Sequence, residues 1–170
     1  ALYKKAVEKF NSANGQYNLG VTYINMDKLA DAKMALEKCE KDADWNNAMG
    51  VIALRENNLD AAAEYFDASG NATAIQNAAI INILDGEYKA AAKNLEGVKS
   101  FNAALVQVLL GNYAPVAECN CECPSFAYLR AVVAARQGNA EGVKKNLEVA
   151  KKCEKLAARA EKDIEFAQYK

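Results

Sequence analysis

The sequence predicts an all-α fold, a solenoid of stacked helical hairpins, from two observations. First, a short phrase made of a turn residue followed by alanine recurs along the chain, as in Gly86-Glu87-Tyr88-Lys89-Ala90-Ala91. The turn residues of the five copies are separated by 30, 29, 25 and 27 positions, and they are Asp27, Asn57, Gly86, Gly111 and Gly138. Self-similarity at such a spacing is typical of stacked repeat proteins. Second, alanine is abundant and the 170 residues include only two prolines, which favours helix nearly throughout.

Each recurring phrase is expected to mark the turn between two amphipathic helices. The leading helix ends at the Asp, Asn or Gly, because helices often end with a residue in the left-handed conformation, which Gly adopts freely and Asn tolerates. The second helix begins just after the turn, where an Asn or Asp side chain can cap it. The turn residues therefore fix where every predicted hairpin reverses direction.

The predicted hairpins divide the chain into five repeats and two end pieces. The repeats cover residues 15–42, 43–70, 71–98, 99–123 and 124–150. Residues 1–14 match the second helix of a half repeat, and residues 151–170 predict a charged capping helix with Leu156, Ala160 and Ile164 inward. We expect a single repeat domain that is a piece of a longer protein with neighbouring domains, because Ala1 already falls inside an expected helix.

Small residues recur at matching positions in the first two repeats. Gly20 and Gly50 lie 30 positions apart, and each is followed by a large residue of the second helix, Leu36 or Phe66. We expect the glycines to let neighbouring helix backbones approach closely, while the large side chains fill the layer behind them.

The same segments carry a resemblance to a known family. Leu19-Gly20-Val21-Thr22-Tyr23, followed by Ala32 and Leu36, resembles a tetratricopeptide repeat, and the second repeat, with Met49-Gly50, Ala62 and Phe66, is similar. The match is good over residues 1–69 and fair from there to the end. It implies a right-handed superhelix whose leading helices line a concave face.

The sequence also departs from the usual pattern of that family. Every repeat is shorter than the usual length of about 34 residues, and the usual Trp position holds Gln16 or Asn46. The phrase from Trp45 to Arg55 is similar to the repeat regions of cell-envelope (OmpA-type) proteins of anaerobic gut bacteria. This second resemblance implies a bacterial cell-envelope or periplasmic location, with the cytoplasm as the alternative.

The concave face implied by the resemblance supplies the candidate binding residues. The helical period directs seven polar or aromatic side chains of the leading helices inward: Tyr17, Asn47, Arg55, Gln76, Phe101, Tyr128 and Arg136. Tyrosine and arginine are enriched at binding hot spots. Some family members hold the C-terminal carboxylate of a chaperone with Lys and Asn. The matching places here hold Tyr17 and Val21, so we expect no affinity for such acidic tails.

The fourth repeat breaks the pattern where its second helix should form. Ala114-Pro115-Val116-Ala117-Glu118 predicts a truncated helix, and a short loop carries Cys119, Cys121 and Cys123 before Ser125 caps the next helix. Three cysteines in five residues allow a metal or redox site. Structural zinc, however, usually takes two separated pairs of ligands. Free cysteines acting as small hydrophobic residues are the simpler interpretation, also for Cys39 and Cys153 on apolar helix faces.

Other constellations for catalysis or cofactor binding are missing from the sequence. It has no histidine, its glycines occur singly rather than in a phosphate-binding loop, and its serines have no histidine partner. The net charge of −1 predicts no global attraction to nucleic acid or acidic membranes. No apolar stretch approaches the roughly 20 residues needed to cross a bilayer. We therefore expect no enzyme, no cofactor, no bound metal, no nucleic-acid partner and no direct membrane insertion.

Three functions follow in order of preference. The first is a non-catalytic scaffold that binds a protein or peptide through the concave face. The second is a structural spacer that serves self-association or contact with neighbouring domains. The third is a metal or redox module centred on Cys119, Cys121 and Cys123.

Overall fold

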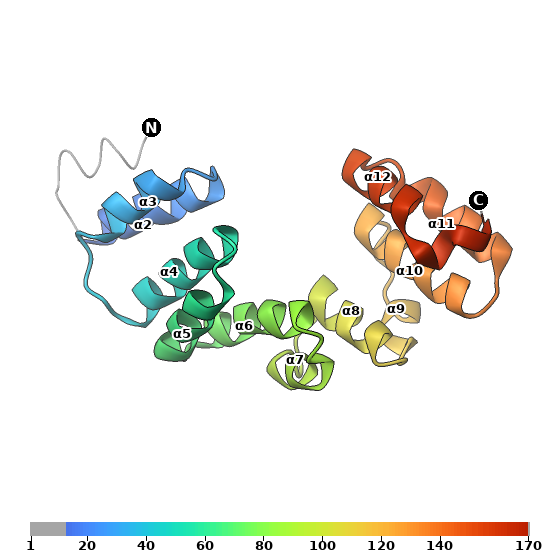
Figure 1. Cartoon of the computed structure of the whole chain (residues 1–170), viewed down its shortest axis with the longest axis horizontal. Helices are drawn as coiled ribbons and strands as arrows, with labels where there is room; N and C mark the ends of the chain where they lie inside the picture. The colour runs from blue at the N-terminus through green and yellow to red at the C-terminus, as the bar shows by residue number, and fades with distance from the viewer. Residues whose placement is uncertain (1–12, 170) are drawn as a thin grey trace. The chain divides into compact units, whose positions relative to one another are not determined.

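The computed structural model describes residues 13–169, and these residues form helices with no β-strand among them, which confirms the all-α prediction. Consecutive helices pack as neighbouring pairs (Figure 1). The contacts concentrate in two compact units that meet in the sequence between Asn94 and Leu95, where a single domain was expected. The predicted half repeat at residues 1–14 lies almost wholly outside the described residues.

The first unit contains three helical pairs. Their bounds are α2 Ala13–Asn25 with α3 Leu29–Leu36, α4 Ala43–Arg55 with α5 Leu59–Ser69, and α6 Ala72–Leu84 with α7 Tyr88–Asn94. The leading helix α4 also contacts the leading helices α2 and α6, so each pair adds to the one before. The core of the first unit consists of apolar clusters, and each cluster spans one helical pair and the next leading helix. One such cluster contains Ile24, Ala32, Leu36, Ala48 and Ile52.

The second unit contains two helical pairs and a C-terminal extension. Its elements are α8 Phe101–Leu109 with α9 Ala114–Ala117, α10 Pro124–Arg136 with α11 Ala140–Ala150, then α12 Glu154–Lys162 and the 3-10 helix η1 Ile164–Tyr169. Helix α10 is central, because it contacts α8, α9, α11, α12 and η1. Its buried residues Leu129, Ala131 and Val132 belong to one core that also takes in Val116 and Phe166.

The leading helices end in the left-handed turns that the sequence predicts. All five turn residues have positive φ, with values of 59° for Asp27, 60° for Asn57, 78° for Gly86, 83° for Gly111 and 71° for Gly138. In each turn the amide of this residue donates to the carbonyl three positions back at 3.0–3.3 Å. The next amide donates five positions back at 2.8–2.9 Å. This pair of bonds is a Schellman motif, which satisfies carbonyls that the helix end would otherwise leave unpaired.

The starts of the leading helices form a second regular series, which the sequence analysis did not identify. The N-cap residues of α4, α6 and α8 are Asp42, Asn71 and Ser100, each 29 positions after the last. Each side chain accepts a hydrogen bond from the backbone amide three residues on, at 2.8, 2.8 and 3.2 Å. Such caps satisfy amides of the first turn and typically stabilise a helix by about 1 kcal/mol.

The close approach of paired helices that was expected at Gly20 and Gly50 is present in both repeats. A Cβ atom placed on Gly20 would lie 2.8 Å from Leu36 Cγ, and one placed on Gly50 would lie 2.5 Å from Phe66 Cε1. Leu36 and Phe66 are fully buried, with exposed fractions of 0% and 1%. Glycine is therefore required by the distance between the paired helices, since both glycines lie inside helices rather than in turns.

The end of the fourth repeat has the truncated helix and loop that were predicted, but the next helix starts at a different residue than expected. Helix α9 has only four residues, as expected for a truncated helix, and a loop of residues 118–123 follows. The next helix begins at Pro124 with Cys123 as its N-cap residue, so the expected Ser125 cap is wrong. The fixed φ of proline suits the first helical position, and its missing N–H costs nothing there.

The predicted capping helix is interrupted. Helix α12 ends at Lys162, the backbone becomes extended at Asp163, and a 3-10 helix replaces the last turns. Ala160 is buried as expected, but Ile164 is 83% exposed and Phe166 is buried instead. The Asp163 carboxylate accepts the amide hydrogen of Glu165 at 3.0 Å, which starts the new helix and changes which side chains face the core.

A substitution at Gly50 tests the packing requirement. Gly50→Ala should lower the free energy of unfolding by about 1–3 kcal/mol, because the buried Phe66 ring must move to accept a methyl group. Helix propensity alone predicts the opposite sign, a gain of about 1 kcal/mol. Urea unfolding followed by far-ultraviolet circular dichroism measures the difference, and a stabilised variant would show that the helix contact is not tight.

Candidate functional site

Arg55, a predicted binding residue, is used to join two leading helices of the first unit. It lies in the last turn of α4, and its Nη1 donates to the backbone carbonyl of Ile24 near the end of α2. The same nitrogen lies 3.3 Å from a carboxylate oxygen of Asp27, the left-handed residue of that turn. A cation at the end of a helix is favoured by the negative end of the helix dipole.

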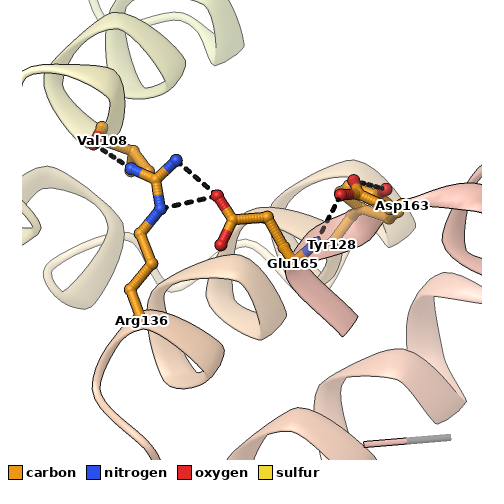
Figure 2. Close-up of polar contacts among 5 residues, drawn as sticks. All are labelled: Val108, Tyr128, Arg136, Asp163 and Glu165. Carbon is orange, nitrogen blue, oxygen red and sulfur yellow. Dashed lines mark hydrogen bonds and ion pairs between the residues drawn. The ribbon is translucent and has the colours of Figure 1, made fainter. Parts of the chain in front are cut away.

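Arg136, another predicted binding residue, joins two leading helices of the second unit. It lies in the last turn of α10, and its Nη1 donates at 2.9 Å to the carbonyl of Val108 near the end of α8, as Figure 2 shows. Its Nε and Nη2 donate to Glu165 Oε1 at 2.8 and 2.6 Å. The side chains of Arg136 and Glu165 are each less than a third exposed. The hydrogen bonds to Glu165 raise the pKa of Arg136, so the guanidinium keeps its charge.

The two arginines occupy the same register relative to their turns. Arg55 and Arg136 each lie two positions before a left-handed residue, Asn57 or Gly138. The carbonyls that they reach, of Ile24 and Val108, each lie three positions before the left-handed residue of the preceding leading helix. One interaction is therefore repeated in both units, and we call it the arginine clamp. The clamp gives both arginines a contact within the chain that requires no partner.

Asn47, Gln76 and Tyr17 lie on the leading helices of the first unit. The Nδ2 of Asn77 on α6 donates to Oδ1 of Asn47 on α4 at 3.0 Å, and both side chains are half-buried. Gln76 beside Asn77 is exposed, and the half-buried Tyr17 hydroxyl donates to the carbonyl of Asp44 at 3.4 Å. Sequence reasoning missed Asn77, although its distance of 30 positions from Asn47 matches the repeat spacing.

Tyr128 does not lie on a surface that a partner can reach, which corrects the prediction for this residue. Its side chain is 4% exposed, and its hydroxyl donates to a carboxylate oxygen of Asp163 at 2.5 Å (Figure 2). Burial raises the pKa of Tyr128 above its ordinary value of 10.0, and the hydrogen bond to Asp163 raises it further. The prediction failed because the C-terminal segment folds back onto α10, which the helical period of α10 alone does not reveal.

Phe101 is half-buried at the start of α8 and packs inside the second unit. Its ring meets Phe126 of α10 edge-on, with ring centroids 5.9 Å apart. This arrangement is typical of aromatic packing between helices. Phe101 therefore contributes to the contact between α8 and α10.

The cysteines of the irregular loop are brought together, whereas the other two lie elsewhere in the chain. Cys119, Cys121 and Cys123 are half-buried thiols, linked by hydrogen bonds within the loop of residues 118–123. Cys39 and Cys153 are also half-buried rather than fully in the core, because each lies in a turn beyond its helix. Within residues 13–169, no three His, Cys, Asp or Glu side chains are grouped so that they could hold a metal ion.

Comparison with models of known protein families gives no match, and comparison with curated proteins gives no significant match. Over the described part of the chain, every helix is too short or too polar to cross a membrane.

Removing an arginine clamp should destabilise the second unit. Arg136→Met should lower the free energy of unfolding by about 2 kcal/mol, because it removes charge-assisted hydrogen bonds to Glu165 and Val108. Lys33→Met is the matched control, since the Lys33–Glu56 pair is 40% exposed on both sides. Loss of the Lys33–Glu56 ion pair should lower the free energy of unfolding by no more than about 1 kcal/mol. Equal effects in urea unfolding would contradict the clamp.

The buried Tyr128 hydroxyl should make stability fall at alkaline pH. Its pKa is raised in the folded state, so the unfolded chain loses the proton first, and the stabilisation present below pH 10.0 is lost as the pH rises toward the folded pKa. Between pH 10.0 and the pKa of Tyr128 in the folded state, the free energy of unfolding of wild type should fall by up to about 1.4 kcal/mol per pH unit relative to that of Tyr128→Phe. Urea unfolding of both proteins from neutral to alkaline pH measures this difference, and parallel curves would contradict it.

Proposed function

We propose that the protein is a non-catalytic scaffold that binds an extended segment of a partner protein along the leading helices of its first unit. In this proposal the hairpins form a right-handed, tetratricopeptide-like superhelix, and α2, α4 and α6 line its concave face. A bacterial cell-envelope location, with the cytoplasm as the alternative, is part of this proposal and is supported only by the resemblance to envelope repeat proteins. The contact surface centres on Asn47, Gln76 and Asn77, which we call the amide row.

The hydrogen bond between Asn47 and Asn77 carries the proposal. It places two side-chain amides of neighbouring leading helices next to each other in a half-buried setting. An amide has two donor hydrogens and an acceptor oxygen with two lone pairs, and this bond uses one donor and one lone pair. The remaining capacity matches the backbone N–H and C=O groups of an extended peptide, which need partners when water is displaced.

The charges of this region favour a neutral ligand backbone over a charged tail. Arg55, the cation that sequence reasoning placed on this face, already contacts the Ile24 carbonyl and the Asp27 carboxylate. Tyr17 lies next to Asp44, which together with burial raises the pKa of its hydroxyl. Because Arg55 is already engaged, an acidic C-terminal tail would meet the Asp27 and Asp44 side chains without the help of this cation, in line with the expectation from Tyr17 and Val21.

Peptide selection followed by titration tests the amide row. A random peptide library is selected against the intact chain, and an enriched peptide is titrated by fluorescence anisotropy. Asn47→Ala with Gln76→Ala should weaken binding at least about tenfold, as expected for the loss of central contacts. The control is Glu64→Ala with Asp67→Ala, which changes exposed residues of α5 and should bind as wild type does.

Two results would contradict the scaffold. One is that no peptide is enriched, and the other is that the amide-row variant, shown to be folded by circular dichroism, binds as tightly as wild type. The first result favours the structural spacer. The arginine clamps support that second candidate, because they use Arg55 and Arg136 to join helices within the chain.

A further inference from the structure

The loop of residues 118–123 places three thiols between two helices of the second unit. It leaves the short helix α9 and leads into α10, and Cys119, Cys121 and Cys123 occupy alternate positions along it. All three residues are half-buried. Three nucleophilic side chains within five residues exceed what packing at a helix boundary requires, and neither the scaffold nor the clamp uses them.

Hydrogen bonds fold the loop around its sulfur atoms. The amide of Cys121 donates to Cys119 Sγ at 3.4 Å, and the amide of Cys123 donates to Cys121 Sγ at 3.3 Å. Residues two apart have Cα atoms at most about 7 Å apart. A disulfide needs a Cα separation of about 4.4–6.8 Å, a range that residues two apart can adopt.

Arg130 holds the loop against α10. Its Nη2 donates to the carbonyls of Cys119 and Cys121 at 2.5 and 2.7 Å. Arg130 follows Cys123 by seven positions, two turns along the same helix, so its side chain reaches back over the loop. The guanidinium therefore fixes the backbone of the loop at Cys119 and Cys121.

Cys121 and Cys123 are not equivalent. The Cys121 thiol hydrogen-bonds to the Cys123 sulfur, which lowers the pKa of Cys123 and raises the pKa of Cys121. Cys123 is also the N-cap residue of α10; it forms no side-chain cap hydrogen bond, but the first-turn amides of Phe126 and Ser125 lie near enough to lower its pKa further. The start of a helix favours a thiolate for this reason. The position of Cys123 at the start of α10 therefore favours it over Cys121 as the attacking thiol.

We propose that Cys121 and Cys123 form a dithiol site for thiol–disulfide exchange, with Cys123 as the attacking thiol and Cys121 as the thiol that closes an internal disulfide. The substrate class is an accessible disulfide of a small molecule or a protein. Arg130 is a positioning residue, because it acts on the loop backbone rather than on the reacting sulfur atoms.

The exchange balances without a further reactant. The Cys123 thiol first releases its proton to the solvent. Its thiolate then attacks one sulfur of the substrate disulfide, the S–S bond of the substrate breaks, and the departing thiolate takes up a proton. Cys121 then loses its proton and attacks Cys123 Sγ in the mixed disulfide, which releases the second substrate thiol. The substrate gains two electrons and two protons and becomes two thiols, while Cys121 and Cys123 lose the same electrons and protons and form one disulfide.

Oxidised glutathione is the probe for this site. The fully reduced, intact chain is mixed with oxidised glutathione at neutral pH, quenched by alkylation, and mapped by peptide mass spectrometry. Wild type should accumulate a Cys121–Cys123 disulfide without lasting glutathione. Cys121→Ser should instead retain one glutathione on Cys123, because no neighbouring thiol of the pair is left to release it. Cys123→Ser should react at least about tenfold more slowly at Cys121.

Controls separate this site from general thiol reactivity. Cys39→Ser and Cys153→Ser change cysteines outside the loop and should react as wild type does. Arg130→Gln, shown to be folded by circular dichroism, should slow closure of the internal disulfide while Cys123 still accepts glutathione. The proposal is overturned if the loop cysteines react no faster than Cys39 and Cys153, or if Cys119 rather than Cys123 takes the first glutathione. Neither result bears on peptide binding by the amide row, which lies in the other unit.

Discussion

The left-handed turn at the end of each leading helix is the constraint on which the rest of the fold depends. A helix cannot continue through a residue with positive φ, and the two hydrogen bonds of the turn satisfy the carbonyls at the helix end. The chain must therefore reverse at this point, and the second helix packs against the first. Because the turns recur at intervals of 25–30 residues, the same contacts recur with them, including the two arginine clamps.

The recurring elements could be predicted from the sequence because their causes are local. A residue that tolerates positive φ, a glycine within a helix and a proline at a helix start act through their own geometry, so Asn57, Gly50 and Pro115 could be interpreted without coordinates. The series of N-caps at Asp42, Asn71 and Ser100 has an equally local cause. Its constant interval of 29 residues was present in the sequence and could have been found in the same way.

The candidate binding residues were predicted less well because their fate depends on distant contacts. The helical period predicted Arg55 and Arg136 on a concave binding face, but it cannot distinguish a side chain that binds a partner from one that bonds the adjacent helix, as both arginines do. Tyr128 is covered by a segment about 35 residues further on, held by Asp163. Burial of this kind depends on where a chain end returns, and no periodic pattern in α10 carries that information.

The irregular loop shows where the repeat rule stops and what takes its place. A regular second helix in the fourth repeat would have placed residues 118–123 on a helix, with their amides bonded to carbonyls within it. With α9 shortened, the amide of Glu118 still bonds the Ala114 carbonyl, but the amides of Cys121 and Cys123 bond to sulfur atoms instead. The contacts between α10 and both α8 and α9 persist, with Val116 still buried in the core. The second unit thus keeps its packing although residues 118–123 do not form a helix. Functional sites are expected at such local departures from an otherwise regular structure.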